Sequence, residues 1–264
     1  MIKYIESKNN KIIKYISNLL NSKSFRKEKK EFVVEGARLC YDAFLSNCEI
    51  KFLLCTENAL SKYDNVLSEL KKFSAKTYIL NEDLFSFISN TKSPQGVMCI
   101  CSFLDKHFSI DKISNKLIAF ENIQDPTNLG TMFRTAEAFG INNIILSSDC
   151  CDVYNPKVLR GSMGAVFRLN FSFVSDLDNK ILKLNSLGYK TYAAVPDSNV
   201  DKVTDVDLYD KCMIIIGNEG NGLKQSTKKA CTNKITIPMP GKAESLNAAM
   251  AAGILMWELL KGGK

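Results

Sequence analysis

The chain has 264 residues, of which 45% are hydrophobic, so it is long enough for two globular domains and apolar enough to give each a core. No apolar run approaches the roughly 20 residues that cross a bilayer, and the first residues lack the apolar core of a signal peptide, so a cytoplasmic location is expected. The nine cysteines contain no C-x-x-C pair and are expected to be reduced and mostly buried. His107, expected in a surface linker, is the only histidine, which excludes a multi-histidine metal site and imidazole catalysis.

The positive charge is concentrated at the start of the chain. Residues 1–30 hold nine Lys and Arg against two Glu, a balance of +7 that equals the net charge of the whole protein. A basic N-terminal arm of this kind favours a polyanion such as nucleic acid as partner. The alternative is a solvated, lysine-rich helix without a ligand.

The first half of the chain alternates between helical and strand patterns. Asn10 can cap a helix with apolar residues at helical spacing, and the basic run of residues 23–30 follows that helix. Beyond it we expect two helices, at residues 36–46 and 59–73, and four strands, at residues 32–34, 51–55, 77–80 and 97–101. Residues 1–103 are therefore predicted to combine the arm with a small α/β domain, and the polar residues 104–115 to form a linker.

The second half, residues 116–264, begins the alternation again. A strand at residues 116–120, a helix at residues 128–139 and a strand at residues 143–146 form a predicted βαβ unit. More strands are expected at residues 171–174, 191–194, 213–216 and 234–237, before a long helix at residues 245–260. The pattern predicts an α/β domain with a parallel sheet, helices on both faces and a ligand site at the carboxyl ends of the strands.

Three turns rich in glycine, asparagine or proline follow strands of this second domain. Glycine permits unusual backbone dihedrals and proline lacks an N–H donor, so such turns leave backbone groups exposed to a ligand. The turns contain neither a G-x-G-x-x-G sequence nor a Walker sequence, and no cluster of cations for a phosphate. They indicate a nucleoside ligand that carries no phosphate.

The three turns read Asn128-Leu-Gly-Thr-Met-Phe-Arg134, Gly217-Asn-Glu-Gly-Asn-Gly-Leu223 and Ile237-Pro-Met-Pro-Gly-Lys-Ala-Glu-Ser-Leu-Asn247. In this order they resemble the signature motifs of the SpoU/TrmH family of RNA 2′-O-ribose methyltransferases, in the SPOUT superfamily. The first half contains Phe32-Val-Val-Glu-Gly-Ala-Arg38 and Thr91-Lys-Ser-Pro-Gln-Gly-Val97. It looks like the ribosomal-protein-like substrate-binding domain of the rRNA-modifying members.

The resemblance implies a fold and a cofactor. The second domain would be a SPOUT methyltransferase domain with a deep trefoil knot, active as a homodimer whose cofactor pocket lies near the dimer interface. The cofactor would be S-adenosyl-L-methionine, bound by Ala194, Gly217, Ile237, Met239, Ser245 and Leu246. The last helix is apolar on all sides, which predicts burial on every side, in the knot core or at a dimer seam.

The resemblance also assigns catalytic positions. Arg134 would act on the ribose hydroxyl, and because an arginine deprotonates only above pH ~12 we expect electrostatic help and not a general base. Asn128 would position RNA or Arg134, with a helix cap as the alternative, and Glu219 would orient Arg134 or else cap the next helix. Ser245 and Asn247 would face the substrate, although Ser245 could be only a helix cap.

The expected function is S-adenosylmethionine-dependent 2′-O-ribose methylation of RNA, with 23S rRNA as the substrate because a separate N-terminal domain accompanies the rRNA-modifying members. The alternatives are a tRNA 2′-O-ribose methyltransferase and a non-catalytic RNA-binding factor in ribosome assembly. Arg38, Lys92 and Arg160 are further candidates for RNA contacts, with plain solvated charges as the alternative. RNA and a second copy of the chain are the expected partners, and no metal or membrane is expected.

Overall fold

The computed structural model describes residues 2–104, 106, 108, 113–208 and 210–261. The chain forms two compact units. The first unit comprises Met1–Asp105 and Asp152–Phe167, and the second comprises Lys106–Cys151 and Arg168–Lys264. The segment Asp152–Phe167 packs with the first unit, where Tyr154 stacks on Phe32 and Phe103 with centroid distances of 4.7 and 4.0 Å. His107 lies outside the described residues.

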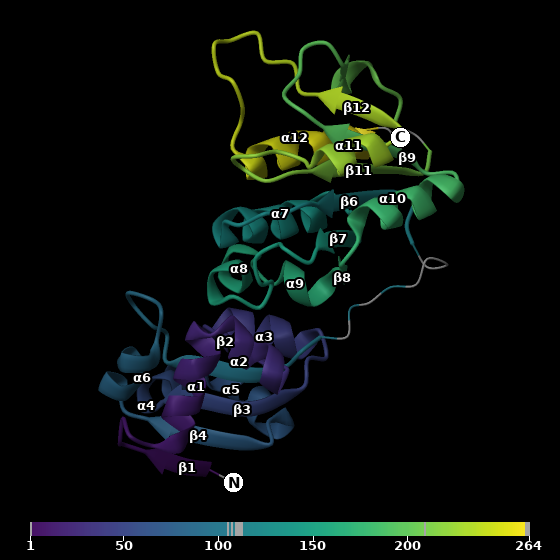
Figure 1. Ribbon diagram of the computed structural model, residues 1–264. Coiled ribbons are helices and arrows are strands. Elements are labelled where there is room, and N and C mark those ends of the chain that lie inside the picture. The colour runs from purple at the N-terminus through teal and green to yellow at the C-terminus, as the bar shows by residue number, and fades with distance from the viewer. Residues whose placement is uncertain (1, 105, 107, 109–112, 209, 262–264) are drawn as a thin grey trace. The chain divides into compact units, whose positions relative to one another are not determined.

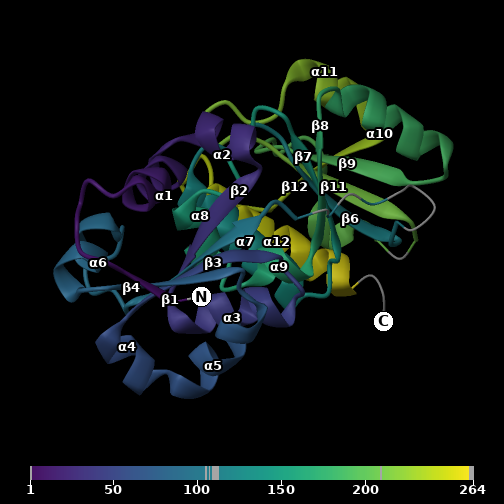
Figure 2. The same ribbon diagram turned by 90° about the horizontal axis from the view of Figure 1, so that it is seen from below.

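The first unit is built on a mixed five-stranded sheet in the order β1-β4-β3-β5-β2. Strands β1, β4 and β3 are parallel, and β5 runs antiparallel to both β3 and β2. Helices α3, α4 and α5 lie on one face of this sheet, and α1 and α2 lie on the other (Figure 2). The strands are β1 (Ile2–Ile5), β2 (Glu31–Glu35), β3 (Ile50–Thr56), β4 (Lys76–Leu80) and β5 (Val97–Ser102). The helices are α1 (Lys11–Asn21), α2 (Lys23–Lys29), α3 (Ala37–Leu45), α4 (Glu57–Lys62), α5 (Asp64–Phe73), α6 (Glu82–Ile88), α8 (Pro156–Gly161) and α9 (Ala165–Arg168), the last extending one residue past the unit boundary.

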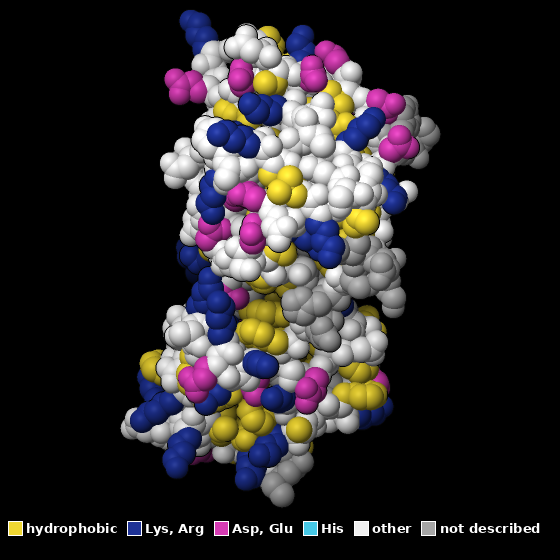
Figure 3. Space-filling view, turned by 45° about the vertical axis from the view of Figure 1, so that its right-hand side comes forward, with side chains coloured by type: hydrophobic (Ala, Val, Ile, Leu, Met, Phe, Trp, Pro, Cys, Tyr) yellow, Lys and Arg dark blue, Asp and Glu magenta, His cyan; other side chains and the backbone are white. Residues whose placement is uncertain are grey.

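The basic residues at the start of the chain are part of this fold, so the expectation of an arm is corrected. They form β1, α1 and α2, and the apolar face of α1 is buried in the core of the unit. Arg26 is itself buried, where its Nε donates to Asp152 Oδ2 at 2.7 Å and its Nη1 donates to Leu19 O at 2.6 Å. Lys and Arg side chains are scattered among Asp and Glu over the face shown in Figure 3, and form no single basic patch there.

The second unit is built on a seven-stranded sheet in the order β10-β12-β9-β11-β6-β7-β8, in which every pair of neighbours is parallel. The predicted parallel α/β sheet is confirmed. Helices α7 and α12 lie on one face and α10 and α11 on the other (Figures 1 and 2). The strands are β6 (Lys116–Phe120), β7 (Asn143–Ser147), β8 (Asn170–Val174), β9 (Lys190–Ala194), β10 (Asp201–Lys202), β11 (Cys212–Ile216) and β12 (Asn233–Thr236). The helices are α7 (Pro126–Ala138), α10 (Leu177–Ser186), α11 (Gln225–Ala230) and α12 (Ala248–Lys261).

Within one chain the last helix is only partly buried, so burial on every side stays a prediction that requires a second copy. Ala252, Leu255 and Met256 pack inward, whereas 64% of Met250 and 47% of Trp257 are exposed. Within one chain, α12 therefore covers the sheet with one face and presents an apolar strip on the other. Among the described helices, none is long and apolar enough to span a membrane.

Candidate functional site

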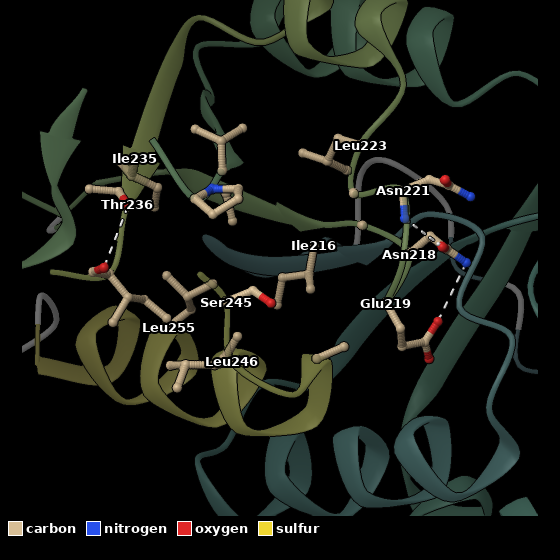
Figure 4. Close-up of a pocket in the computed structure, with 18 of the residues that line it drawn as sticks. Ile216, Asn218, Glu219, Asn221, Leu223, Ile235, Thr236, Ser245, Leu246 and Leu255 are labelled. Atoms are coloured by element: carbon tan, nitrogen blue, oxygen red, sulfur yellow. Dashed lines mark hydrogen bonds between the residues drawn. The ribbon is translucent and has the colours of Figure 1, made fainter. Parts of the chain in front are cut away.

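A cavity of about 400 Å³ lies in the second unit, beside the carboxyl ends of β9, β11 and β12. Parallel sheets bind their ligands at this edge. The walls come from the strand ends, from the loop after β11 and from the segment that leads into α12 (Figure 4). We call it the glycine-loop cavity. Two of the three sequence turns, residues 217–223 and 237–247, thus meet around one space.

The loop after β11 can adopt its shape only with glycine at its first position. A Cβ on Gly217 would lie 2.4 Å from the carbonyl carbon of Gly222 and 2.5 Å from the amide nitrogen of Leu223, which are backbone atoms that cannot give way. Gly222 has a φ of 64°, a left-handed conformation that glycine adopts without strain. Asn218 closes the loop, because its Oδ1 accepts the backbone N–H groups of Gly220 at 2.9 Å and Asn221 at 3.0 Å.

A buried carboxylate behind the loop anchors it to the sheet and to α11. Glu121, which follows β6, is 1% exposed and accepts the Lys224 N–H at 2.8 Å and the Thr227 hydroxyl at 2.6 Å. Glu121 is not among the residues expected from the sequence, although a carboxylate directly after the buried strand of residues 116–120 is a usable signal. Nearby, Lys224 Nζ donates to Asp149 Oδ2 at 2.8 Å.

The pKa of Asp149 is lowered by the groups around its carboxylate. Burial alone would raise the pKa of the carboxyl, but hydrogen bonds from Lys224 and from the Ser147 hydroxyl outweigh it. Asp149 therefore stays ionised and keeps its ion pair with Lys224 across the neutral range.

All six residues expected to bind the cofactor line the glycine-loop cavity. They are Ala194, Gly217, Ile237, Met239, Ser245 and Leu246. The lining is mixed: Ile216, Ile235 and Leu255 complete the apolar walls, and the polar residues include the carboxylates Glu219 and Glu244. Among the described lining residues Lys228 is the single cation. Such a surface suits an uncharged base and ribose better than a phosphate.

A chain of side-chain hydrogen bonds joins the three sequence turns. Asn247 Nδ2 donates to Asn128 Oδ1 at 3.1 Å, and Asn128 Nδ2 donates to Glu219 Oε1 at 3.1 Å. Asn128 is 8% exposed, so these bonds satisfy both ends of a buried amide. These hydrogen bonds link α7, the loop after β11 and the start of α12.

The structure also decides which polar residues cap the helices. Asp125 caps α7 by accepting the Thr127 N–H at 2.8 Å, so the helix-cap alternative for Asn128 is wrong. Asn247 caps α12 by accepting the Ala249 N–H at 2.9 Å. Ser245 is therefore not the cap either, and its side chain lies on the lining of the glycine-loop cavity.

Arg134 does not join this group within one chain. It lies on α7 six residues after Asn128, which turns it about 120° away around the helix axis, and it is exposed. It does not line the glycine-loop cavity. The structure thus brings together Asn128, Glu219 and Asn247, places Ser245 on the cavity lining, and leaves Arg134 apart from them.

The remaining candidates lie elsewhere. Arg38 and Arg160 line a cavity in the first unit, whereas Lys92 is exposed and does not line it. Over the described ranges, no group of three or more His, Cys, Asp or Glu side chains is arranged to hold a metal ion.

Two family models match the chain. One is described as the SpoU rRNA Methylase family and covers residues 115–257. The other is described as the MRM3-like substrate binding domain and covers residues 10–99.

The chain also resembles individual proteins over nearly its full length. It is 30% identical over 260 residues to the 23S rRNA (guanosine(2553)-2′-O)-methyltransferase RlmP of Bacillus subtilis, which covers 98% of this chain and 99% of the relative. Among solved structures, an AdoMet-bound rRNA methyltransferase from Sinorhizobium meliloti has a TM-score of 0.87 and 28% identity, and the match covers 98% of both chains. The SpoU methyltransferase AviRb from Streptomyces viridochromogenes, in complex with AdoMet, has a TM-score of 0.84 and 25% identity over 97% of this chain and 100% of AviRb.

Proposed function

Because the chain belongs to the SpoU rRNA methylase family, we propose that it methylates a ribose 2′-hydroxyl of 23S rRNA with S-adenosylmethionine as the methyl donor. The observation that carries this proposal is the glycine-loop cavity, whose lining contains all six expected cofactor residues. A Cβ at Gly217 would collide with the backbone of Gly222 and Leu223, so the loop that borders the cavity requires glycine at that position. The trefoil knot and the cytoplasmic location are part of the same proposal.

The residues of the cavity fit the cofactor chemically. Ile237 and Leu246 offer apolar surface to an adenine ring, and the loop from Gly217 offers backbone donors and acceptors. When bound, S-adenosylmethionine supplies an electrophilic methyl group and leaves as a neutral thioether, so the protein needs no general acid.

The task left to the protein lies on the side of the nucleophile. With the cofactor bound, the ribose 2′-oxygen would receive the methyl group, and its hydroxyl proton would pass to water. The positively charged guanidinium of Arg134 stabilises the negative charge that develops on the oxygen and holds an adjacent phosphate. The hydrogen-bonded chain of Asn247, Asn128 and Glu219 acts by positioning, because it holds the turns that surround the reacting groups in one arrangement.

The exposed position of Arg134 supports a homodimer. The apolar strip on α12 contains Met250 and Trp257, and Trp257 contacts Phe139 at the end of α7 with a centroid distance of 5.6 Å. A second copy packed on α7 and α12 would cover this strip and bring its own Arg134 toward the glycine-loop cavity of the first copy. The active site would then be shared between two protomers.

Mixed dimers test this sharing. Arg134→Ala and Gly217→Ala protomers, each inactive alone, are expected to regain up to about a quarter of the wild-type activity when they are mixed and allowed to exchange. If mixtures that contain heterodimers remain inactive, the active site is not shared between protomers. If light scattering gives the mass of a monomer, the protein is not a dimer.

Transfer of labelled methyl groups tests the function. Purified protein is incubated with labelled S-adenosylmethionine and one RNA in each reaction. The RNA is 23S rRNA, 16S rRNA or tRNA, taken from cells that lack the protein. Label is expected in 23S rRNA, in a dinucleotide that resists alkaline cleavage because its 2′-oxygen is blocked. Label confined to tRNA would favour the tRNA alternative, and the absence of transfer would contradict the proposal. The N-terminal unit supports rRNA as the substrate, because it matches a substrate-binding domain.

A further inference from the structure

A second cavity, of about 360 Å³, lies in the first unit. It is bordered by the end of β2, by the first turn of α3, by residues 91–95 and by α8 and the residues that follow it. We call it the Glu35 cavity. Its lining includes Glu35, Arg38, Leu39, Thr91, Arg160 and Met163.

Glu35 brings a buried, half-satisfied carboxylate to this cavity. The residue is 8% exposed, and its Oε1 accepts the hydroxyl groups of Ser89 and Thr91, the latter at 2.8 Å. Its Oε2 is buried and has no hydrogen-bond partner among the residues that the structure describes. A buried carboxylate oxygen without a donor is unfavourable, so this atom is suited to receive an N–H group from a ligand.

Arg160 supplies the complementary group. Its Nη1 is buried and lacks a hydrogen-bond partner, and no ion pair joins it to Glu35 in the described part of the chain. The guanidinium requires an acceptor, such as a carbonyl oxygen or a ring nitrogen. A ligand that satisfies both residues must present a donor and an acceptor together.

The rest of the lining includes the carboxylate of Asp42, and beside it groups that suit a phosphate and a flat ring. Arg38 is exposed in the first turn of α3, where its own N–H and that of Leu39 have no intrahelical acceptor. Gln95 Oε1 takes the Ala37 N–H at 2.9 Å, so the first donor of the helix is already used. Met163 is 43% exposed and provides a polarisable thioether that packs well on aromatic rings.

We propose that the Glu35 cavity binds one unpaired nucleotide of the substrate RNA. The base edge donates an N–H to Glu35 Oε2 and accepts from Arg160 Nη1, and Arg38 with the start of α3 binds the phosphate. Every nucleobase carries a donor beside an acceptor on its edge, and proteins read unstacked RNA bases in this way. The inference rests on the proposed function only for the source of the nucleotide, which is RNA.

The test uses the full chain and nucleoside monophosphates as probes. Saturation-transfer NMR with GMP, AMP, CMP and UMP is compared between the wild type, Glu35→Gln and Arg160→Ala. Glu35→Gln keeps an oxygen for the Ser89 and Thr91 hydroxyls, so it is expected to fold. Lys157→Ala is the matched control, because Lys157 is an exposed cation on the same helix as Arg160 and does not line the cavity. A fluorescein-labelled, single-stranded RNA 12-mer of mixed sequence provides a second readout by anisotropy.

At least one monophosphate is expected to bind the wild type and Lys157→Ala, and to lose its signal in both cavity variants. The 12-mer is expected to bind about tenfold more weakly to these variants. Affinity for S-adenosylhomocysteine should stay unchanged, so a failure of the methyltransferase proposal would be seen separately. The inference is overturned if no monophosphate binds, or if both variants bind the 12-mer within twofold of wild type. Inorganic phosphate that binds as tightly as the nucleotides would refute the base contact with Glu35.

Discussion

The glycine-loop cavity and the Glu35 cavity differ in what they leave for a ligand. Around the glycine-loop cavity, the buried polar side chains Asn128 and Glu121 are satisfied by other parts of the protein. In the Glu35 cavity, Glu35 Oε2 and Arg160 Nη1 have no hydrogen-bond partner among the described residues. We therefore expect the first cavity to bind its ligand mainly by backbone groups and shape, and the second to bind its ligand through these two unpaired atoms. Variants in the two cavities should separate cofactor binding and turnover from RNA affinity.

The largest expected effect is at Gly217. In Gly217→Ala, the new Cβ would meet the Gly222 carbonyl carbon at 2.4 Å, so the loop must open. Calorimetry should show at least a hundredfold loss of S-adenosylhomocysteine affinity, with the affinity for the RNA 12-mer kept. Gly220→Ala is the control in the same loop, since its Cβ would lie 3.7 Å from Asn218 Oδ1, an ordinary contact. Equal affinities of the two variants would contradict the role of the tight turn.

Arg134→Ala should separate turnover from cofactor binding. We expect kcat to fall by about 10²–10³-fold, the usual loss when a group that stabilises developing charge is removed. Affinity for S-adenosylhomocysteine should stay within twofold of wild type, because Arg134 does not line the cavity. Arg134→Lys keeps the charge and should recover part of the rate. Full activity of Arg134→Ala would place the catalytic charge elsewhere.

Removing Asn128 should have a smaller effect on both rate and stability. Asn128→Ala leaves Asn247 Nδ2 and Glu219 Oε1 without this partner, which costs about 1–2 kcal/mol of unfolding free energy. We expect kcat to fall about tenfold, with chemical denaturation giving the stability change. Thr127→Ala, at an exposed neighbouring position of α7, is the control. A loss of stability without any change in kcat would show that the hydrogen bonds between Asn247, Asn128 and Glu219 have only a structural role.

The smallest effect concerns pH. The folded-state pKa of Asp149 lies below its ordinary value of 3.8, so the Lys224 pair stabilises the fold above about pH 4, and this contribution disappears as the pH falls through the folded-state pKa. The pair is partly exposed, so its contribution is about 0.5 kcal/mol or less. Asp149→Asn should be slightly destabilised at pH 7 and equal to wild type once Asp149 is protonated. A difference that persists in acid would contradict this linkage.

Local patterns in the sequence predicted much of the fold. Strand and helix periodicity located the buried strands, such as residues 116–120, which match β6 in full. Glycine and proline positions report directly on backbone geometry, and two of the three turns, residues 217–223 and 237–247, border the glycine-loop cavity. The expected membership of the SpoU/TrmH family, with its substrate-binding domain, is confirmed by the two family matches.

The features that were missed depend on long-range packing. Nothing near Asp152 in the sequence shows that its segment joins the first unit, where the carboxylate meets Arg26. The basic run looked like an arm because charge counts ignore the buried face of α1. Arg134 lies in a motif beside Asn128, yet helix geometry points the two residues in different directions. The unpaired atoms of Glu35 and Arg160 become visible only when distant segments are placed together.

Mapping of 2′-O-methylated nucleotides in rRNA tests the central proposal most directly. Total rRNA is compared between cells that contain the protein, cells that lack it and cells that carry only the Arg134→Ala variant. The proposal predicts one 2′-O-methyl site in 23S rRNA that is present in the first cells and missing from the other two. An identical methylation pattern in all three, or a change confined to tRNA, would contradict it.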